Sequence, residues 1–119
     1  MELPEEYVEA AEKVMQNGNF KISTSKIRGF LSIANDIYNV ESRRKEETLA
    51  KESLDKLNML RVRILYEAGR DKNNVKPFVE ESRIINYLKS IGDSRQKFIR
   101  FCRYLEALVA YHRFFSESE

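Results

Sequence analysis

The sequence predicts an all-α protein, a single-domain bundle of about five helices in which one helix, residues 43–69, is unusually long. Apolar residues recur at helical spacings along most of the chain, and no stretch alternates at period two for long enough to predict a strand. A charged fraction of 34% with four glycines and two prolines is typical of an ordered, charge-coated domain. With 119 residues, the whole of 1–119 is expected to form one domain around a single modest core.

The first two helices are predicted from their end signals. Residues 1–18 are expected to contain an acidic N-terminal helix, because Pro4 stands where a first-turn proline belongs and the apolar stripe that follows ends before Gly18. The segment TSKIRGFLSIANDIYN, residues 24–39, predicts the second helix, with a serine or threonine cap at its start. Gly29 in its interior costs about 1 kcal/mol relative to alanine. It marks either a tolerated defect or the close crossing of another helix.

The remaining helices follow from one charged run and from the proline, glycine and serine that bound the others. A continuous helix over 43–69 would be about 40 Å long, which exceeds what a small bundle needs. Either its first turns fray, or it projects and packs against another copy of the protein. After the loop RDKNNVKP, Pro77 can begin a fourth helix that ends at Gly92. Ser94 then caps a fifth helix that extends to about Phe115.

The net charge of +2 conceals a segregated distribution. Residues 1–18 contain five glutamates and one lysine, and the acidic tail, residues 116–119, adds two glutamates, which leaves +8 on the body between them. A basic body with acidic ends suits a polyanionic partner. Solvated surfaces of other proteins show similar asymmetries, so the charge distribution alone leaves both interpretations open.

The C-terminal segment LEALVAYHRFF contains residue types that catalysis uses, but at unsuitable spacing. His112 is the only histidine, Cys102 is the only cysteine, and Glu106 lies between them. On one helix, Cys102 and His112 would be about 15 Å apart along the axis, and Glu106 and His112 about 9 Å. A nucleophile and its base need roughly 3 Å. His112 instead falls on the apolar stripe of this helix, where we expect a core histidine with one satisfied hydrogen bond.

Neither a catalytic centre nor a metal site is expected elsewhere. One histidine and one cysteine would need carboxylates to complete a zinc site, and no carboxylate cluster has suitable spacing. The chain also lacks a glycine-rich phosphate loop and a nucleophile elbow. The sequence therefore predicts a non-enzymatic protein with no metal or other cofactor. A single cysteine, an acidic N-terminus and the lack of an apolar run of about 18 residues favour a cytoplasmic protein with no membrane association.

Basic residues recur beside the apolar stripes of three predicted helices. Arginine forks match phosphate oxygens, and binding of this kind is largely sequence-independent and strongly salt-dependent. Scattered charges that only keep the protein soluble are the alternative explanation. The candidate phosphate-contacting residues are Lys26, Arg28, Arg61, Arg63, Arg70, Lys97, Arg100 and Arg103.

Three segments make the chain resemble the small helical subunit of type III-A (Csm) CRISPR–Cas effector complexes. They are TSKIRGFLSIANDIYN at 24–39, LRVRILYEAGR at 60–70 and KFIRFCRYLEALVAYHRFF at 97–115. The last is the most specific, since the family ends in a similar Glu-Ala-Leu-Val-Ala-Tyr-His run. The resemblance extends from about residue 20 to 115 and is weak in the first 18 residues and at 41–53.

The resemblance implies a non-catalytic protein of prokaryotic antiviral defence. Several copies would stack as the inner filament of the complex, contact the backbone of the CRISPR guide RNA and target RNA, and pack against the other Csm subunits. The eight candidate basic residues then become RNA-binding residues. By position in the matching segments, the first choices for RNA contact are Lys26, Arg28, Arg70, Lys97 and Arg100, followed by Arg61, Arg63 and Arg103.

Two other functions stay open at this point. A helical structural adaptor or homodimer would make no direct RNA contact, and its basic residues would only solubilise it. A small RNase or another hydrolase would need His112 in a polar cleft beside a carboxylate from another helix. The arrangement of the basic residues and the surroundings of His112 distinguish these alternatives.

Overall fold

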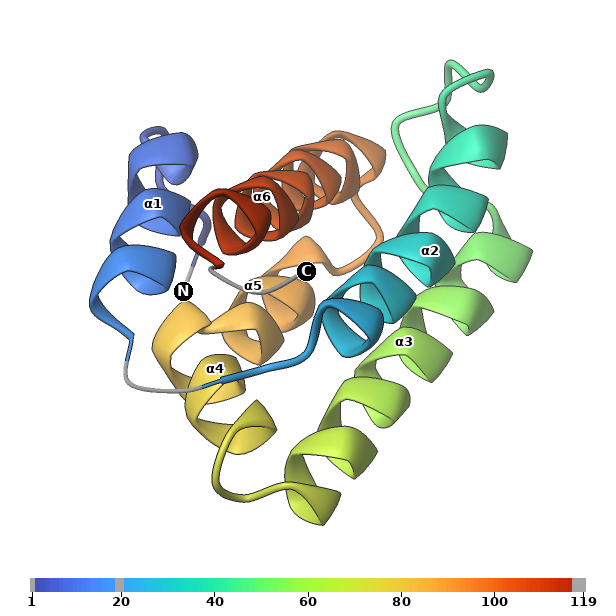
Figure 1. Cartoon of the computed structure of the whole chain (residues 1–119). Helices are drawn as coiled ribbons and strands as arrows, with labels where there is room; N and C mark the ends of the chain where they lie inside the picture. The colour runs from blue at the N-terminus through green and yellow to red at the C-terminus, as the bar shows by residue number, and fades with distance from the viewer. Residues whose placement is uncertain (1, 19–20, 117–119) are drawn as a thin grey trace.

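The chain folds into six α-helices, which the computed structural model describes over residues 2–18 and 21–116 (Figure 1). Over these ranges no β-strand is present, and the predicted all-α class is confirmed. No helix of the described part is long and apolar enough to cross a bilayer. The helices are α1 (Tyr7–Asn17), α2 (Thr24–Glu41), α3 (Lys51–Arg70), α4 (Val75–Ser82), α5 (Ile84–Ile91) and α6 (Arg95–Phe115).

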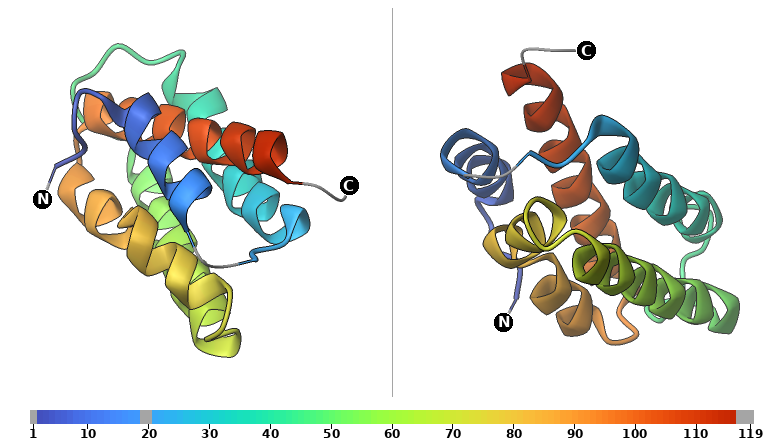
Figure 2. Two further views of the ribbon diagram at one scale, coloured as in Figure 1. Left: turned by 60° about the vertical axis from the view of Figure 1, so that its left-hand side comes forward. Right: turned by 60° about the horizontal axis from the view of Figure 1, so that its bottom comes forward.

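Helix α6 lies at the centre of the bundle. Helices α1 and α2 pack on its two sides, α5 packs along it, and α3 packs on the outer side of α2 (Figures 1 and 2). The core-facing side chains of Phe98, Phe101, Leu105 and Leu108 on α6 are at most 1% exposed. The apolar stripe predicted for the last helix therefore forms the middle of the core.

Two predicted helix starts are confirmed by the hydrogen bonds of their capping serines. The Ser23 hydroxyl accepts from the backbone N–H of Lys26 at 3.1 Å, and the Ser94 hydroxyl accepts from that of Lys97 at 3.2 Å. Each bond satisfies one of the N–H groups that the first turn of a helix leaves unpaired. The caps also hold the backbone of two candidate RNA-binding lysines, Lys26 and Lys97, in the first turns of α2 and α6.

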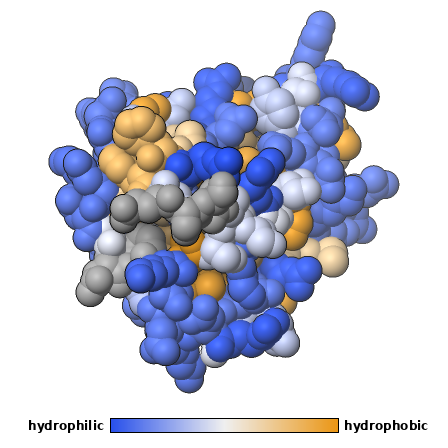
Figure 3. All heavy atoms as spheres, in the orientation of Figure 1, coloured by the Kyte–Doolittle hydropathy of each residue, from blue (hydrophilic) through white to orange (hydrophobic). Residues whose placement is uncertain are grey.

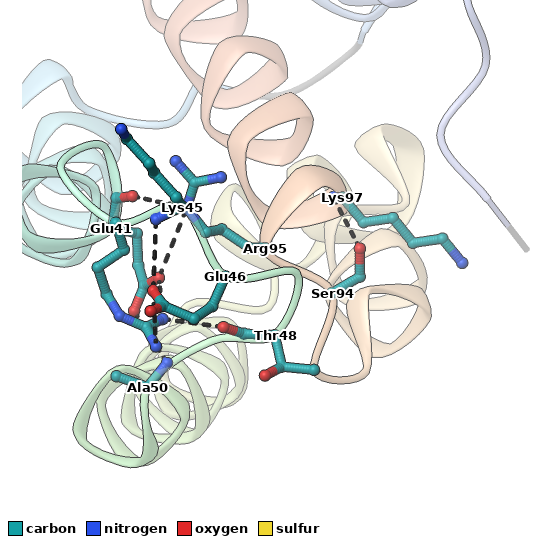
Figure 4. A network of polar contacts seen from close by, with 9 residues as sticks. Glu41, Lys45, Glu46, Thr48, Ala50, Ser94, Arg95 and Lys97 are labelled. Carbon is teal, nitrogen blue, oxygen red and sulfur yellow. Dashed lines mark hydrogen bonds and ion pairs between the residues drawn. The ribbon is translucent and has the colours of Figure 1, made fainter.

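Helix α3 differs from the predicted helix over 43–69. It begins at Lys51 and ends at Arg70, so its 20 residues are no longer than the 21 of α6. The charged segment before it, residues 42–50, is an irregular connection (Figure 4). The prediction of an unusually long helix, and the alternative that it projects toward another copy, are therefore wrong. The other alternative, that the first turns of 43–69 do not hold as helix, agrees with the start at Lys51.

Backbone pairing with another segment explains why residues 42–50 are not helical. The Leu49 N–H donates to the Asp93 carbonyl at 2.8 Å, and the Arg95 N–H donates to the Glu47 carbonyl at 2.9 Å. These backbone groups are thereby engaged with the turn before α6 and cannot form a helical ladder. The contacts join positions that are distant in sequence, which helical periodicity does not report.

Glu41, the last residue of α2, is a fully buried carboxylate beside this connection (Figure 4). Its Oε2 accepts from the Ala50 N–H at 3.0 Å and its Oε1 accepts from Arg44 at 2.8 Å. Arg95 donates its Nε–H to the Glu41 carbonyl at 2.7 Å. Burial alone would raise the pKa of Glu41, but hydrogen bonds from Ser53, Arg44 and Ala50 outweigh it and hold the pKa below its ordinary value. We call Glu41, Arg44, Ala50 and Arg95 the Glu41 corner.

The predicted fourth helix from Pro77 to Gly92 is two short helices, α4 and α5, that meet at Arg83. Arg83 has φ 56° and ψ 28°, a left-handed conformation that ends one helix and precedes the next. The carbonyl of the buried Ser82 accepts from the Tyr104 hydroxyl at 2.9 Å, so this bend is tied to α6. Periodicity did not distinguish one helix from two because both keep their apolar residues toward the core.

The remaining predictions concern the chain ends and Gly29. Helix α1 lies within the predicted 1–18, and of the predicted acidic tail only Ser116 lies within the described residues, whereas 117–119 lie outside them.

A side-chain carbon at Gly29 would meet no atom within 4 Å. Gly29 is therefore a tolerated helix defect, and the close crossing of another helix is excluded.

Candidate nucleic-acid interface

The residue types that catalysis could use do not form a site. Cys102 is buried, and burial together with the charge of Glu106 raises the pKa of its thiol to about 12, so the reactive thiolate is disfavoured. His112 is half-buried, and its Nε2 lies 2.7 Å from the Ile22 carbonyl, the hydrogen bond expected of a packed histidine. In the described part of the chain, no group of three or more His, Cys, Asp or Glu is placed to hold a metal ion.

Three of the predicted basic residues converge on one carboxylate between α2 and α3. The Glu67 Oε1 accepts from Lys26 Nζ of α2 at 2.6 Å. On α3, Arg70 lies 3.8 Å from Oε1 and Arg63 lies 3.9 Å from Oε2. Because residues three and four apart share one helix face, Arg63 and Arg70 flank Glu67 along α3, and Lys26 reaches it from the neighbouring helix. We call Lys26, Arg63, Glu67 and Arg70 the Glu67 cluster.

In the Glu67 cluster the carboxylate is mostly buried and the two arginine side chains are exposed to solvent. The Glu67 side chain is 11% exposed, whereas those of Arg63 and Arg70 are 58% and 59% exposed. The hydrogen bond from Lys26 is the main cause that lowers the pKa of Glu67. Burial opposes it, and the nearby charges of Lys26, Arg70 and Arg63 add to the lowering. Three cations therefore surround one ionised carboxylate, and two guanidinium groups keep donors available to a phosphate.

Two of the predicted basic residues of α6 have a different environment, because they contact the N-terminal segment: Lys97 at the surface and Arg100 half-buried. Lys97 Nζ lies 3.2 Å from the Glu2 carboxylate. Arg100 donates to the Pro4 carbonyl at 3.0 Å and its guanidinium stacks 5.3 Å from the centroid of the Tyr7 ring. RNA contact through either residue would have to compete with these intramolecular contacts.

The other three predicted residues lie outside both groups. Arg28 on α2 and Arg103 on α6 are exposed, and within the described residues no ion pair involves either of them. Arg61 on α3 is half-buried and points to the Asn58 side chain at 3.5 Å. The eight candidates thus occupy several faces. Lys26, Arg63 and Arg70 meet at one carboxylate, and Lys97 and Arg100 line a common pocket with the N-terminal segment. The face drawn in Figure 3 is largely hydrophilic, with apolar groups in small patches.

Sequence reasoning missed two components of this region. Glu67 was not singled out, although its spacing from Arg63 and Arg70 could have indicated it; its contact with Lys26, 41 residues away, could not be read from the chain. The second is Tyr66, whose ring is 58% exposed and has the Arg70 guanidinium 5.9 Å from its centroid. The resemblance included Tyr66 only as part of a matching segment.

The fold and this surface define a class of protein: a small helical bundle with basic surface clusters and an apolar environment around its only cysteine. Comparison with known proteins then specifies the family. The family model described as Csm2 Type III-A matches residues 2–118. The chain belongs to the Csm2 type III-A family, which confirms the resemblance.

Individual relatives are similar in sequence to this chain over most of their own length. A protein of Streptococcus thermophilus named CRISPR system Cms protein Csm2 is 38% identical over 117 residues, which cover 93% of this chain and 92% of the relative. The protein of the same name from Mycobacterium tuberculosis H37Rv is 34% identical over 116 residues, or 94% and 93% of the two chains. That of Enterococcus italicus is 32% identical over 106 residues, or 87% and 73%.

Proposed function

We propose that the protein is a non-catalytic small subunit of a type III-A CRISPR RNA-guided interference complex and binds RNA backbone through basic residues. Copies of it stack as the inner filament beside the guide RNA and the target RNA, and pack against the other Csm subunits in the prokaryotic cytoplasm. Family membership supports the place in the complex. The Glu67 cluster is the observation that carries the RNA contact.

The geometry of the Glu67 cluster suits phosphate for two reasons. The ionised Glu67 gathers three cations that would otherwise repel one another, so part of the entropy cost of ordering long side chains is met before RNA arrives. Because the cluster keeps a net positive charge, an incoming phosphate is attracted to its exposed side. Guanidinium groups can then donate to phosphate oxygens while Lys26 stays on Glu67.

One observation favours the alternative of a structural adaptor without direct RNA contact. Lys97 and Arg100 are both engaged with the N-terminal segment, so these two predicted cations contribute to intramolecular packing. The same explanation does not extend to Arg63 and Arg70, whose side chains remain more than half exposed. We therefore place the RNA contact first on the Glu67 cluster.

Charge reversal within the assembled complex tests this proposal. We expect Arg63→Glu combined with Arg70→Glu to weaken retention of target RNA by at least about tenfold, because each lost charge-assisted hydrogen bond is worth about 1.5–3 kcal/mol. The matched control is Arg43→Glu with Lys51→Glu, which changes net charge equally on exposed residues outside the candidate set. Retention would be measured by electrophoretic shift with complexes of verified composition.

Two outcomes would contradict the proposal. Equal RNA retention by the double variant and the wild type, with normal assembly, would favour the adaptor. Equal weakening by the double variant and its control would show that overall charge, and not the Glu67 cluster, determines RNA binding.

A further inference from the structure

An apolar groove lies beside the Glu67 cluster on the outer face of α2 and α3. Its apolar lining consists of Ile33 from α2 and of Met59, Val62 and Tyr66 from α3. Lys56, Asn58 and Arg63 complete the lining, which therefore contains two cations and no carboxylate. The groove and the cluster share Arg63, so they form one continuous surface.

The side chains of α3 in this groove are open to solvent. Met59 is 68% exposed, Val62 is 65% exposed and Tyr66 is 58% exposed. They stand at i, i+3 and i+7, so they form one row along the helix. Large apolar side chains exposed in a contiguous row, rather than singly, are typical of a binding surface.

Tyr66 connects the apolar row with the charges. Arg63 and Arg70 lie within about one helical turn of it on either side, roughly 5 Å along the axis. The Arg70 guanidinium lies 5.9 Å from the ring centroid, which is within range of a cation–π contact. An aromatic ring therefore stands between two guanidinium groups, at the edge of the groove.

This combination fits a single-stranded nucleic acid better than a protein partner. Unpaired bases stack on exposed aromatic rings while flanking cations contact the phosphates of the same strand. A protein partner would have to present carboxylates to Lys56 and Arg63, whereas every nucleotide of a single strand supplies a phosphate for such cations next to a base for the ring. The positive rim and the planar ring together favour the nucleotide.

We propose that Tyr66 is a base-stacking residue, so that the groove beside the Glu67 cluster holds an unpaired nucleobase of RNA whose neighbouring phosphates contact Arg63 and Arg70. This inference rests on the proposed RNA-backbone function and adds a contact that depends on the base. Such a contact would bind single strands with accessible bases more tightly than RNA whose bases are paired or missing.

The test compares two RNA probes and four variants of the full chain, one of which, Arg63→Gln, removes a cation of the groove. The probes are a fluorescein-labelled single-stranded oligouridylate and an abasic ribose-phosphate strand of the same length. Tyr66→Leu removes the ring and keeps apolar bulk, Tyr66→Phe keeps the ring, and Phe114→Leu is the matched control at a 77% exposed aromatic residue of α6. Anisotropy would be followed at low salt up to protein concentrations on the order of 10⁻⁴ M, the weak end of non-specific affinity.

The proposal predicts a base-dependent loss. Tyr66→Leu should bind oligouridylate about tenfold more weakly, which corresponds to about 1.4 kcal/mol. Its affinity for the abasic strand should equal that of the wild type, and Tyr66→Phe and Phe114→Leu should bind both probes normally. Arg63→Gln should weaken binding of both probes to similar extents.

Three results would overturn the inference. If Arg63→Gln weakens binding but Tyr66→Leu does not, the backbone function stands and the base contact is wrong. If the wild type binds neither probe, the base contact is overturned, and the charge-reversal variants in the assembled complex decide the backbone function separately. If Tyr66→Leu leaves RNA binding unchanged and instead alters the sedimentation coefficient of the protein, the groove is a contact with a second copy.

Discussion

The Glu41 corner and the Glu67 cluster are built from the same chemistry and differ in burial. Each places a helix carboxylate among cations, and in each the pKa of the carboxyl group is lowered. Glu41 is fully buried, and its cations Arg44 and Arg95 are 26% and 17% exposed. The arginines paired with Glu67 are more than half exposed.

From this difference we propose different tasks for the two sites. In the Glu41 corner, Arg44 donates to the carboxylate and to the backbone carbonyl of Thr48, and Arg95 donates to the backbone carbonyl of Glu41. These bonds fix the course of the chain between α2 and α3. In the Glu67 cluster, one lysine satisfies the carboxylate at short distance and the arginines remain longer-range partners with free donors. We therefore propose that the Glu41 corner, whose cations are mostly buried, is structural, and that the Glu67 cluster, whose arginines are exposed, is available to a ligand.

The largest effect is expected from removing the charge of Glu41. Glu41→Gln should lower the free energy of unfolding by about 3 kcal/mol, because it removes the buried partner of two partly buried arginines and leaves only the exposed Glu46 beside Arg44. Urea denaturation would measure it, with Glu67→Gln as the matched control for the open cluster. A loss in Glu67→Gln as large as that in Glu41→Gln would remove the distinction between the two sites.

The pH dependence of stability sharpens the same contrast. Because the folded-state pKa of Glu41 lies below the ordinary value of 4.5, its contribution is complete above that pH and is lost as pH falls through the folded pKa. The stability difference between wild type and Glu41→Gln should therefore shrink on acidification. Denaturation series between pH 7 and pH 3 would measure this, and a difference that stays constant or grows would contradict the lowered pKa.

Two glycines provide a smaller comparison of the same two regions. Gly92, beside the turn that pairs with Leu49, has φ 57° and ψ −121°, so Gly92→Ala should destabilise the fold by about 2 kcal/mol. Gly29, one turn from Lys26 on α2, has open space around it, and Gly29→Ala should stabilise by about 1 kcal/mol. Thermal unfolding would measure both shifts. Shifts of the same sign would contradict this account.

The sequence was informative where structure is local. The apolar stripe of α6 and the cap at Ser94 depend on residues three or four positions apart, and both were predicted correctly. The cap of α2 is Ser23, where the sequence had left a serine or a threonine open. The connection 42–50 and the break at Arg83 depend on contacts with distant segments, and both were missed.

The candidate site follows the same rule. Residue type and resemblance selected Lys26, Arg63 and Arg70 as separate candidates, but their convergence on Glu67 required the packing of α2 on α3. That Lys97 and Arg100 contact the N-terminal segment also required the fold, because more than 90 residues separate the partners.

The salt dependence of single-stranded RNA binding tests the central claim most directly. The slope of log K against log salt concentration is about −0.7 per phosphate contact, so Arg63→Gln with Arg70→Gln should make the slope shallower by about 1.4. Arg44→Gln, at the Glu41 corner, should lower stability and leave the slope unchanged. If the Glu67-cluster variant keeps the wild-type slope, or if Arg44→Gln reduces it equally, the Glu67 cluster is not the RNA-binding surface.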